Sequence, residues 1–273
     1  MDEKATAEEP EVSRTGIQAL DSALVVLRIL AAIEGPASLK EIAQRAKMPA
    51  SKVHRYLASF AKAGLVRQVQ RAGLYDLAKG ATELGLAAMA RMDLVNEAAD
   101  HLERLVAETG AAGLVAIWGP HGPTVVRWQR TGSFVITSLG LGTTLPLLNS
   151  ASGRVFLAYS PPILVRDLLR AEIDRAKALR LSWPDLNPNR ENEIGLLVQT
   201  VRNMGYASVD GRFIPGLNAI SVPVLNWQGE VEAAVTLTAG DHSISEPGSP
   251  ALALLRKVCD AVSVTGRPQL PKV

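Results

Sequence analysis

Basic side chains gather in one short stretch, residues 36–66, where Lys and Arg alternate with apolar residues and Glu41 is the single acidic residue. Ammonium and guanidinium groups neutralise phosphates, and a guanidinium also donates two parallel hydrogen bonds to the edge of a guanine. The stretch is therefore typical of a surface that binds a polyanion. A solvated, charged face is the alternative, and the spacing of the residues must decide between the two.

Charge is unevenly distributed along the whole chain, which has 273 residues and a net charge of +2. Residues 14–79 contain eleven Lys and Arg against four acidic residues, whereas residues 80–273 contain seventeen against eighteen. A chain of this length can form two domains, each with its own core. We therefore predict a small basic domain that binds a polyanion, joined to a larger and nearly neutral domain.

Other kinds of site lack the residue patterns that they need. The sequence contains no H-E-x-x-H, G-x-S-x-G or P-loop motif, and no metal-site spacing among its four histidines, which are His54, His101, His121 and His242. The lone Cys259 excludes an internal disulfide and a zinc site built from cysteines, and it indicates a reducing compartment. We expect no catalytic residue, no metal site and no cofactor.

Membrane contact is not expected either. No apolar run approaches the roughly 20 residues that a spanning helix needs, and the acidic, polar segment 1–16 has no apolar core of a signal peptide. We expect a cytoplasmic protein with tails at residues 1–16 and 267–273, the first of them disordered.

Three helical patterns position the basic side chains. The first covers residues 18–33, where apolar residues recur every three or four positions. The second begins at the S-x-x-E capping box of Ser38 and Glu41 and is broken at Pro49. Ser51 is then placed to cap a third helix. Three helices with a tight break before the third are typical of a helix-turn-helix.

The third helix has two unlike faces. Apolar Leu57 and Phe60 lie on one side. Ser51, Arg55 and Lys62 fall near the opposite side when residues are placed at intervals of about 100°. A basic ridge with small residues between its charges can enter a DNA major groove, because bulky side chains would hold the helix away from the base edges.

A hairpin follows the third helix. The runs LVRQVQ and LYDLA are β-like, and Arg67 and Arg71 would lie where a wing meets phosphates. The N-terminal domain is therefore predicted to be a winged helix-turn-helix. The predicted DNA-binding residues are Ser38, Lys40, Ser51, Lys52, His54, Arg55, Ser59, Lys62, Arg67 and Arg71.

The rest of the chain shows an antiparallel-leaning α+β order. Residues 82–92 and 93–109 have helical patterns, and one side of the first carries Leu84 and Met92, which we interpret as intramolecular core rather than as a dimer seam. The predicted strands are GLVAIW, TVVRWQR, SFVITSL, AISVPVL and EVEAAVTLTA, and the predicted helices are residues 149–159, 163–171 and 190–204.

One segment of this part suits a ligand. PLLNSASGR places Asn149, Ser150 and Ser152 at the start of a helix, where unpaired N–H groups and the positive end of the helix dipole favour an anion such as a carboxylate. These side chains could instead only cap the helix, and we prefer that interpretation for Asn149 and Ser150.

Two sets of motifs resemble the IclR-type bacterial transcriptional regulators over residues 17–265. The first comprises IQALDSALVVLRIL, SLKEIAQRAKMPASKVHRYLASFAKAGLV and the wing residue Tyr75, and the second comprises GTTLPLLNSASGRVFLA and MGYASVDGRFIPGLNAISVPVLNWQGEVEAAVTLTAG. The resemblance implies an α+β chain with a winged helix-turn-helix at 17–79, a linker helix at 80–95 and a GAF-like α/β effector-binding domain at 96–266. It also implies a homodimer or homotetramer and a small-molecule effector.

The effector pocket is assigned by this resemblance alone. It implies binding by Ala151, Ser152, Val209, Asp210, Ala219, Thr236 and Thr238. Leu148 stands where the family often has His, Ala219 where Cys is common, and Gly211-Arg212 where acidic residues are common. These departures favour a more apolar pocket or a larger ligand, such as an aromatic acid.

The sequence thus predicts a ligand-responsive, sequence-specific transcriptional regulator that binds a palindromic operator in double-stranded DNA as a dimer or tetramer. The alternative is a small-molecule-binding or hydrolytic domain whose winged helix serves protein contacts. Positive charge on the third helix favours the regulator.

Overall fold

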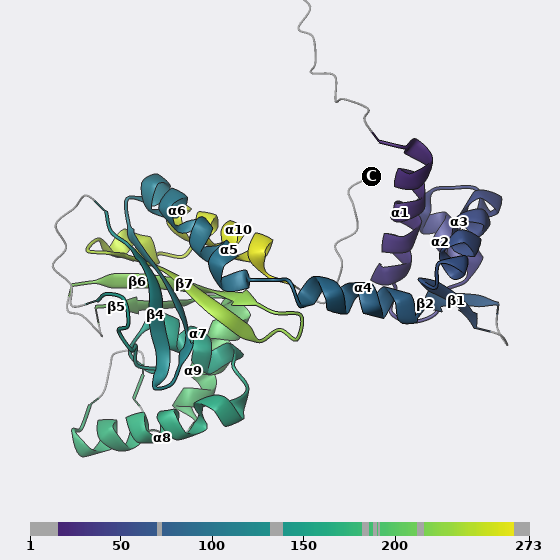
Figure 1. The fold of residues 1–273 in the computed structure, drawn as a ribbon. Helices are drawn as coiled ribbons and strands as arrows, with labels where there is room; N and C mark the ends of the chain where they lie inside the picture. Colours follow the sequence, from purple (N-terminus) through teal and green to yellow (C-terminus); the bar gives the residue numbers. More distant parts are fainter. Residues whose placement is uncertain are drawn as a thin grey trace, which may run out of the picture. The chain divides into compact units, whose positions relative to one another are not determined.

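The computed structural model describes residues 16–69, 73–131, 139–181, 186–187, 190, 192–211 and 216–264. The chain divides into two compact units, the first ending at Met92 and the second beginning at Asp93 (Figure 1). The predicted tails other than Gly16, the wing residue Arg71, Arg212 and nearly all of the predicted strand SFVITSL lie outside the described residues. None of the described helices is both long and apolar enough to span a membrane.

The first unit is the predicted winged helix-turn-helix, which is confirmed. Three helices are followed by an antiparallel hairpin and a fourth helix, and their bounds are α1 Gln18–Ala32, α2 Leu39–Ala46, α3 Ala50–Lys62, β1 Val66–Val69, β2 Leu74–Leu77 and α4 Lys79–Met89. Val26, Ile42, Val53 and Leu57 are fully buried in one core. This core fixes the orientation of α3, so its opposite face is presented to solvent.

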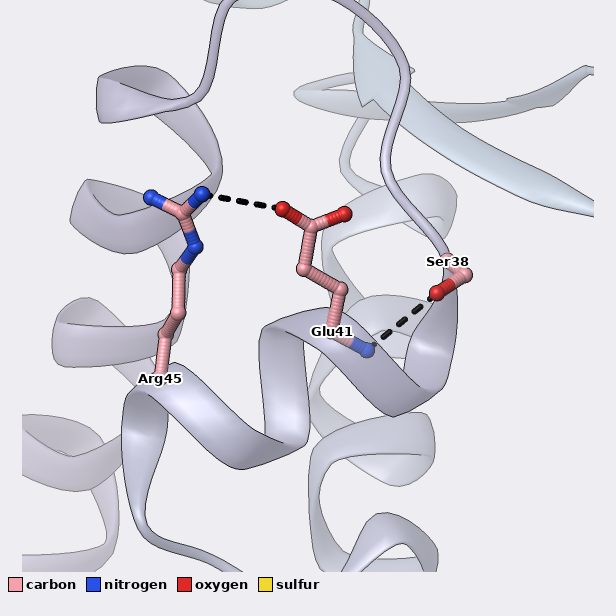
Figure 2. Close-up of polar contacts among 3 residues, drawn as sticks. All are labelled: Ser38, Glu41 and Arg45. Carbon is pink, nitrogen blue, oxygen red and sulfur yellow. Dashed lines mark hydrogen bonds and ion pairs between the residues drawn. The ribbon is translucent and has the colours of Figure 1, made fainter.

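Helix α2 begins with half of the predicted capping box. Ser38 Oγ accepts a hydrogen bond from the Glu41 N–H at 3.2 Å (Figure 2). The Glu41 carboxylate, which a complete box would direct back to the N-cap N–H, instead pairs with Arg45 at 3.0 Å. An ion pair one turn along the helix thus takes the place of the second capping bond.

The predicted cap of α3 is wrong by two residues. The N-cap is Pro49, with no side-chain cap, and the helix begins at Ala50, so Ser51 lies in the first turn and is exposed. Pro49 has a φ of −57°, and its ring holds φ in the range from which a helix can start. Ser51 is therefore released from capping and is available for contacts outside the chain.

Helix α4 corrects a second prediction. Leu84 and Met92, on the predicted apolar side, are 62% and 42% exposed, so this side is not part of the core of the first unit. The first turn of α4 packs closely on the hairpin side, where the Gly80 N–H donates to the Gly64 carbonyl at 3.0 Å and a Cβ at Gly80 would lie 2.6 Å from that oxygen.

Within the described residues, the second unit is built on a five-stranded antiparallel sheet with the order β4-β3-β7-β6-β5. The predicted helix 93–109 is split at His101, whereas Gly110 ends it as predicted, with a φ of 68°. The elements are α5 Leu94–Asp100, α6 Leu102–Thr109, β3 Ala112–Gly119, β4 Gly122–Gln129, α7 Ala151–Tyr159, α8 Pro162–Ala178, α9 Glu193–Met204, β5 Ala207–Asp210, β6 Asn218–Leu225, β7 Val231–Ala239, the 3-10 helix η1 His242–Ser245 and α10 Pro250–Val262.

Helices cover both faces of this sheet (Figure 1). Val235 and Leu237 of β7 point to one face, where they pack in a core with α5, α6 and α10. Ala234 and Thr236 alternate with them and point to the other face, which α7 covers. This second face carries the residues predicted to bind the effector.

Candidate DNA-binding surface and ligand site

The exposed face of α3 carries most of the predicted DNA-binding residues. Val53, Leu57 and Phe60 are buried and attach the helix to its unit. The polar residues exposed on the helix are Ser51, His54, Arg55, Ser59 and Lys62, and the exposed small residues Ala58 and Ala61 lie between them. Small residues between the charges leave room for base edges to approach the helix.

The cations of this face are available for an external anion. Neither Arg55 nor Lys62 makes an ion pair with any described residue. Lys52 is half-buried, with its ammonium 5.8 Å from the centre of the Tyr56 ring, and Lys40 is exposed on α2. Ser38 differs from these residues, because its hydroxyl serves as the N-cap of α2.

The wing is already partly neutralised. Arg67 of β1 pairs with Asp76 of β2 at 2.8 Å across the hairpin, and the Arg67 side chain remains 65% exposed. An arginine in such a pair offers a phosphate less net charge than an unpaired one. Arg71, the other arginine of the wing that was predicted to bind DNA, lies outside the described residues.

The start of α7 is a tight, specific turn. Ser150 is the N-cap, and its Oγ accepts from the Gly153 N–H at 2.9 Å and donates to the Pro146 carbonyl at 2.7 Å. A Cβ added at Gly153 would lie 1.9 Å from that carbonyl oxygen. Only glycine allows the chain to fold this closely over the first turn of α7.

A chain of three buried hydroxyls lies under this helix start. Ser152 Oγ is 2.8 Å from Thr236 Oγ1, which donates to Ser221 Oγ at 2.8 Å. None of the three residues is more than 2% exposed. The three hydroxyls carry three hydrogens and make two hydrogen bonds with one another, so one hydrogen is left undonated, on the hydroxyl at one end of the row. If all three hydroxyls reverse, that hydrogen is on Ser152 and can be donated to a ligand.

The apolar residues of the predicted pocket come together beside the hydroxyls. Ala151, Val209 and Ala219 form a buried cluster of their own. Thr238 is 4% exposed and pairs directly with Ala219, which in turn pairs with Val209. Asp210 is exposed at the end of β5, so it is the one predicted pocket residue that is not buried.

Sequence reasoning missed three polar residues of this site. Ser221 stands two positions after Ala219 on the same strand, so strand alternation could have identified it. Arg154, on α7, is only 3% exposed although its neighbours are apolar. Glu172 comes from α8 and gave no local signal, because it acts on residues 147 and 148.

No group of three or more His, Cys, Asp or Glu side chains placed to hold a metal ion occurs in the part of the chain that the structure describes. Cys259 is fully buried in α10, and burial raises the pKa of its thiol well above the ordinary value. Neither observation assigns a reaction to this unit.

Two family models match the chain in order. The IclR helix-turn-helix domain matches residues 19–70, and the model of the bacterial transcriptional regulator IclR C-terminal matches residues 86–264. Together they cover the candidate DNA-binding surface and the ligand site.

Individual relatives span nearly the whole chain. The HTH-type transcriptional regulator BhcR of Paracoccus denitrificans is 29% identical over 92% of this chain and 86% of its own. The DNA-binding transcriptional repressor YiaJ of Escherichia coli is 25% identical over 96% of this chain and 92% of its own. The crystal structure of HmgR from Pseudomonas aeruginosa superposes with a TM-score of 0.77 at 30% identity, covering 94% of this chain and all of that one.

Proposed function

Because this chain belongs to the IclR family of bacterial transcriptional regulators, we propose that it binds a palindromic operator as a dimer or tetramer and that a small organic acid changes its affinity for DNA. In this proposal residues 17–79 bind DNA, residues 80–95 link the domains and residues 96–266 bind the effector. The curated relatives are regulators, which argues against the alternative of a hydrolytic domain.

Direct readout of bases is proposed for α3. Arg55 is exposed on the face opposite the core residues Val53 and Leu57, and it has no ion-pair partner among the described residues. A guanidinium in this position can make a bidentate contact with a guanine in the major groove. Lys62 and His54 flank it and are placed for phosphates, which fix the register of the helix on the duplex.

Dimerisation is supported by apolar side chains that the first unit leaves exposed. Ile17, Leu20 and Leu24 of the α1 region are 70%, 52% and 45% exposed, and Leu84 of α4 is 62% exposed. An exposed apolar set of this kind favours burial against a second copy. Two winged helices so joined would contact half-sites about 34–36 Å apart, or a multiple of that spacing.

The acid is proposed to bind at the start of α7, and this site carries the effector part of the proposal. The N–H groups of Ala151 and Ser152 have no acceptor among the described residues, and both residues are 2% exposed. Two such donors, the helix dipole and the Ser152 hydroxyl together suit a carboxylate. The apolar body of the acid would rest on Ala151, Val209 and Ala219, while Thr238 faces it from β7.

A gel shift on DNA flanking the protein's own gene tests both halves of the proposal. We expect a discrete complex that withstands competitor DNA, and a change in its affinity with at least one member of a panel of small aliphatic and aromatic acids. Binding that is equal for all sequences would contradict specific recognition. Specific binding that no acid alters would contradict the effector site.

A further inference from the structure

The peptide that leads into α7 is held by charged groups from two directions. The carboxylate of Glu172 on α8 accepts hydrogen bonds from the N–H of Leu147 at 2.7 Å and from that of Leu148 at 3.0 Å. Arg154 Nε donates to the Leu148 carbonyl at 2.9 Å. Leu148 therefore has its N–H on an anion and its C=O on a cation, and it is 1% exposed.

Arg154 anchors this peptide to the edge of the sheet. Its second donor group, Nη1, reaches the carbonyl of Ser208 on β5 at 3.2 Å. Burial lowers the pKa of Arg154 to about 10, while Asp210 acts to raise it, so the guanidinium is charged at neutral pH. A buried charge persists only in a fixed network of hydrogen bonds, so this end of the peptide has little freedom to move.

Glu172 and Arg154 together form a clamp on this peptide, and Glu172 is the member that takes up a proton as the pH falls. Its side chain lines a cavity of about 530 Å³ between α8 and the segment before α7, together with Asn149, Arg175 and His121. Burial raises the pKa of Glu172, whereas the two backbone N–H groups and Arg175 lower it, and the net shift is upward. The carboxylate thus takes up a proton at a higher pH than an ordinary glutamate.

We propose that Glu172 is a positioning residue for the effector site: by holding the backbone of Leu147 and Leu148 it fixes the start of α7, where Ala151 and Ser152 present their N–H groups to the acid. This inference rests on the proposed function, because it needs an acid bound at α7. Donors that are already in place need no reordering on binding, so the ionised clamp strengthens binding of the acid.

The proposal gives acid binding a particular pH dependence. Only ionised Glu172 accepts with both oxygens, so affinity is highest above its raised pKa and falls as the pH decreases through it. Arg175 faces Glu172 from the same helix, and His121 lines the same cavity from the β3–β4 turn. Because His121 lines the same cavity, its contribution is measured separately.

The test compares wild type with Glu172→Gln, and it uses Asp174→Asn as a control that changes the charge of the same helix at an exposed position. Glutamine keeps the shape of the side chain, but it has one acceptor oxygen and turns an N–H₂ group toward a backbone N–H. Affinity of the full-length chain for pyruvate and for benzoate is measured by calorimetry from about pH 5 to about pH 8, which begins above the pKa of an ordinary glutamate, because that of Glu172 is raised. His121→Asn is measured in parallel.

We expect Glu172→Gln to bind the acid about tenfold less tightly near neutral pH and to lose the pH dependence, because one charge-assisted hydrogen bond is gone. Asp174→Asn and His121→Asn should retain the wild-type profile. In the wild-type chain without ligand, the amide resonances of Leu147 and Leu148 should shift together as Glu172 titrates, and this readout needs no variant to fold.

The outcomes separate the two proposals. If the wild-type chain binds neither acid, the effector site itself is contradicted and the role of Glu172 with it. If wild type binds an acid and Glu172→Gln binds it with the same affinity and pH profile, only the positioning role is overturned. Amide resonances of Leu147 and Leu148 that do not respond to pH would also overturn it.

Discussion

Arg55 is the residue whose loss should change sequence preference. It is exposed on the ridge of α3 and unpaired within the described chain, so a bidentate contact with guanine is open to it. Such a contact discriminates by roughly 1–3 kcal/mol. Arg55→Ala should therefore weaken operator binding by about tenfold or more and flatten base preference at one position of each half-site. Binding to a set of single-base operator variants measures this.

Lys62→Ala provides the matched control on the same helix. A lysine on phosphate contributes equally to all sequences, so its loss should weaken specific and non-specific binding alike and reduce the salt dependence by about one unit per contact. Retention of full operator preference by Arg55→Ala would show that α3 does not read bases through this residue.

Gly153 should tolerate no side chain. The Cβ of an alanine would lie 1.9 Å from the Pro146 carbonyl oxygen and 2.7 Å from Leu147 Cα, both backbone atoms that are held in place. Gly153→Ala should cost at least about 1–3 kcal/mol of the free energy of unfolding, as overpacking does. Gly195→Ala on α9 is the control, because nothing lies within 4 Å of its Cβ position, and alanine favours a helix. Chemical denaturation of both variants checks this, and equal stabilities would contradict the close packing.

At this scale the sequence predicted the residues that share a local motif. Ser152 comes from the short segment PLLNSASGR, whereas Ala151, Thr236 and Thr238 come from the family resemblance, and the two threonines share one face of their strand. Glu172 could not be predicted, because its partners lie 25 and 24 residues away and depend on how α8 packs. The Arg67–Asp76 pair likewise needs the hairpin register.

At the scale of elements, apolar periodicity predicted most helices and strands but not what each one contacts. The pattern of α4 was correct, yet the interpretation as intramolecular core was wrong. A stripe of apolar residues is the same whether it packs inside one chain or against another. The split at His101 also gave no signal, since Leu94, Ala98, Leu102 and Leu105 keep one continuous apolar stripe across it.

Exposure of α4 leads to a prediction about assembly. If its apolar side lies against a second copy, Leu84→Gln should weaken dimerisation by at least about tenfold, because each dimer would lose two buried leucines. The stability of the unit itself should be unchanged, since Leu84 is 62% exposed in it. Ile163→Gln on α8, where the side chain is 69% exposed, is the control. Sedimentation over a range of concentrations measures this, and an unchanged dimer would show that α4 is not the seam.

At the scale of the whole molecule, the proposed function requires a ligand bound in the second unit, which begins at Asp93, to change the DNA affinity of the first unit, which ends at Met92. A ligand can change DNA affinity only by as much as it prefers one of two states of the protein. Typical couplings of about 1–3 kcal/mol correspond to a change of about 5- to 150-fold. By reciprocity, operator DNA must change the affinity for the acid by the same factor.

Ser152 allows this coupling to be removed without touching the DNA-binding surface. Leucine at this position deletes the hydroxyl that meets Thr236 at 2.8 Å and fills the space proposed for the carboxylate. Ser152→Leu should therefore abolish the acid response and acid binding, while the affinity of the ligand-free protein for its operator stays within about twofold, because Ser152 lies in the second unit. Ser152→Ala, which deletes the hydroxyl without filling the space, should weaken the response rather than remove it.

Gel shift and calorimetry on the same preparations decide this prediction. Full acid affinity in Ser152→Leu would place the acid elsewhere in the second unit. Loss of ligand-free operator binding as large as that expected of Arg55→Ala, in a chain that still unfolds cooperatively, would mean that the start of α7 sets DNA affinity even without a ligand. The position of this helix start would then itself distinguish the two states, and Glu172 and Arg154, which hold it, would be the residues that set their balance.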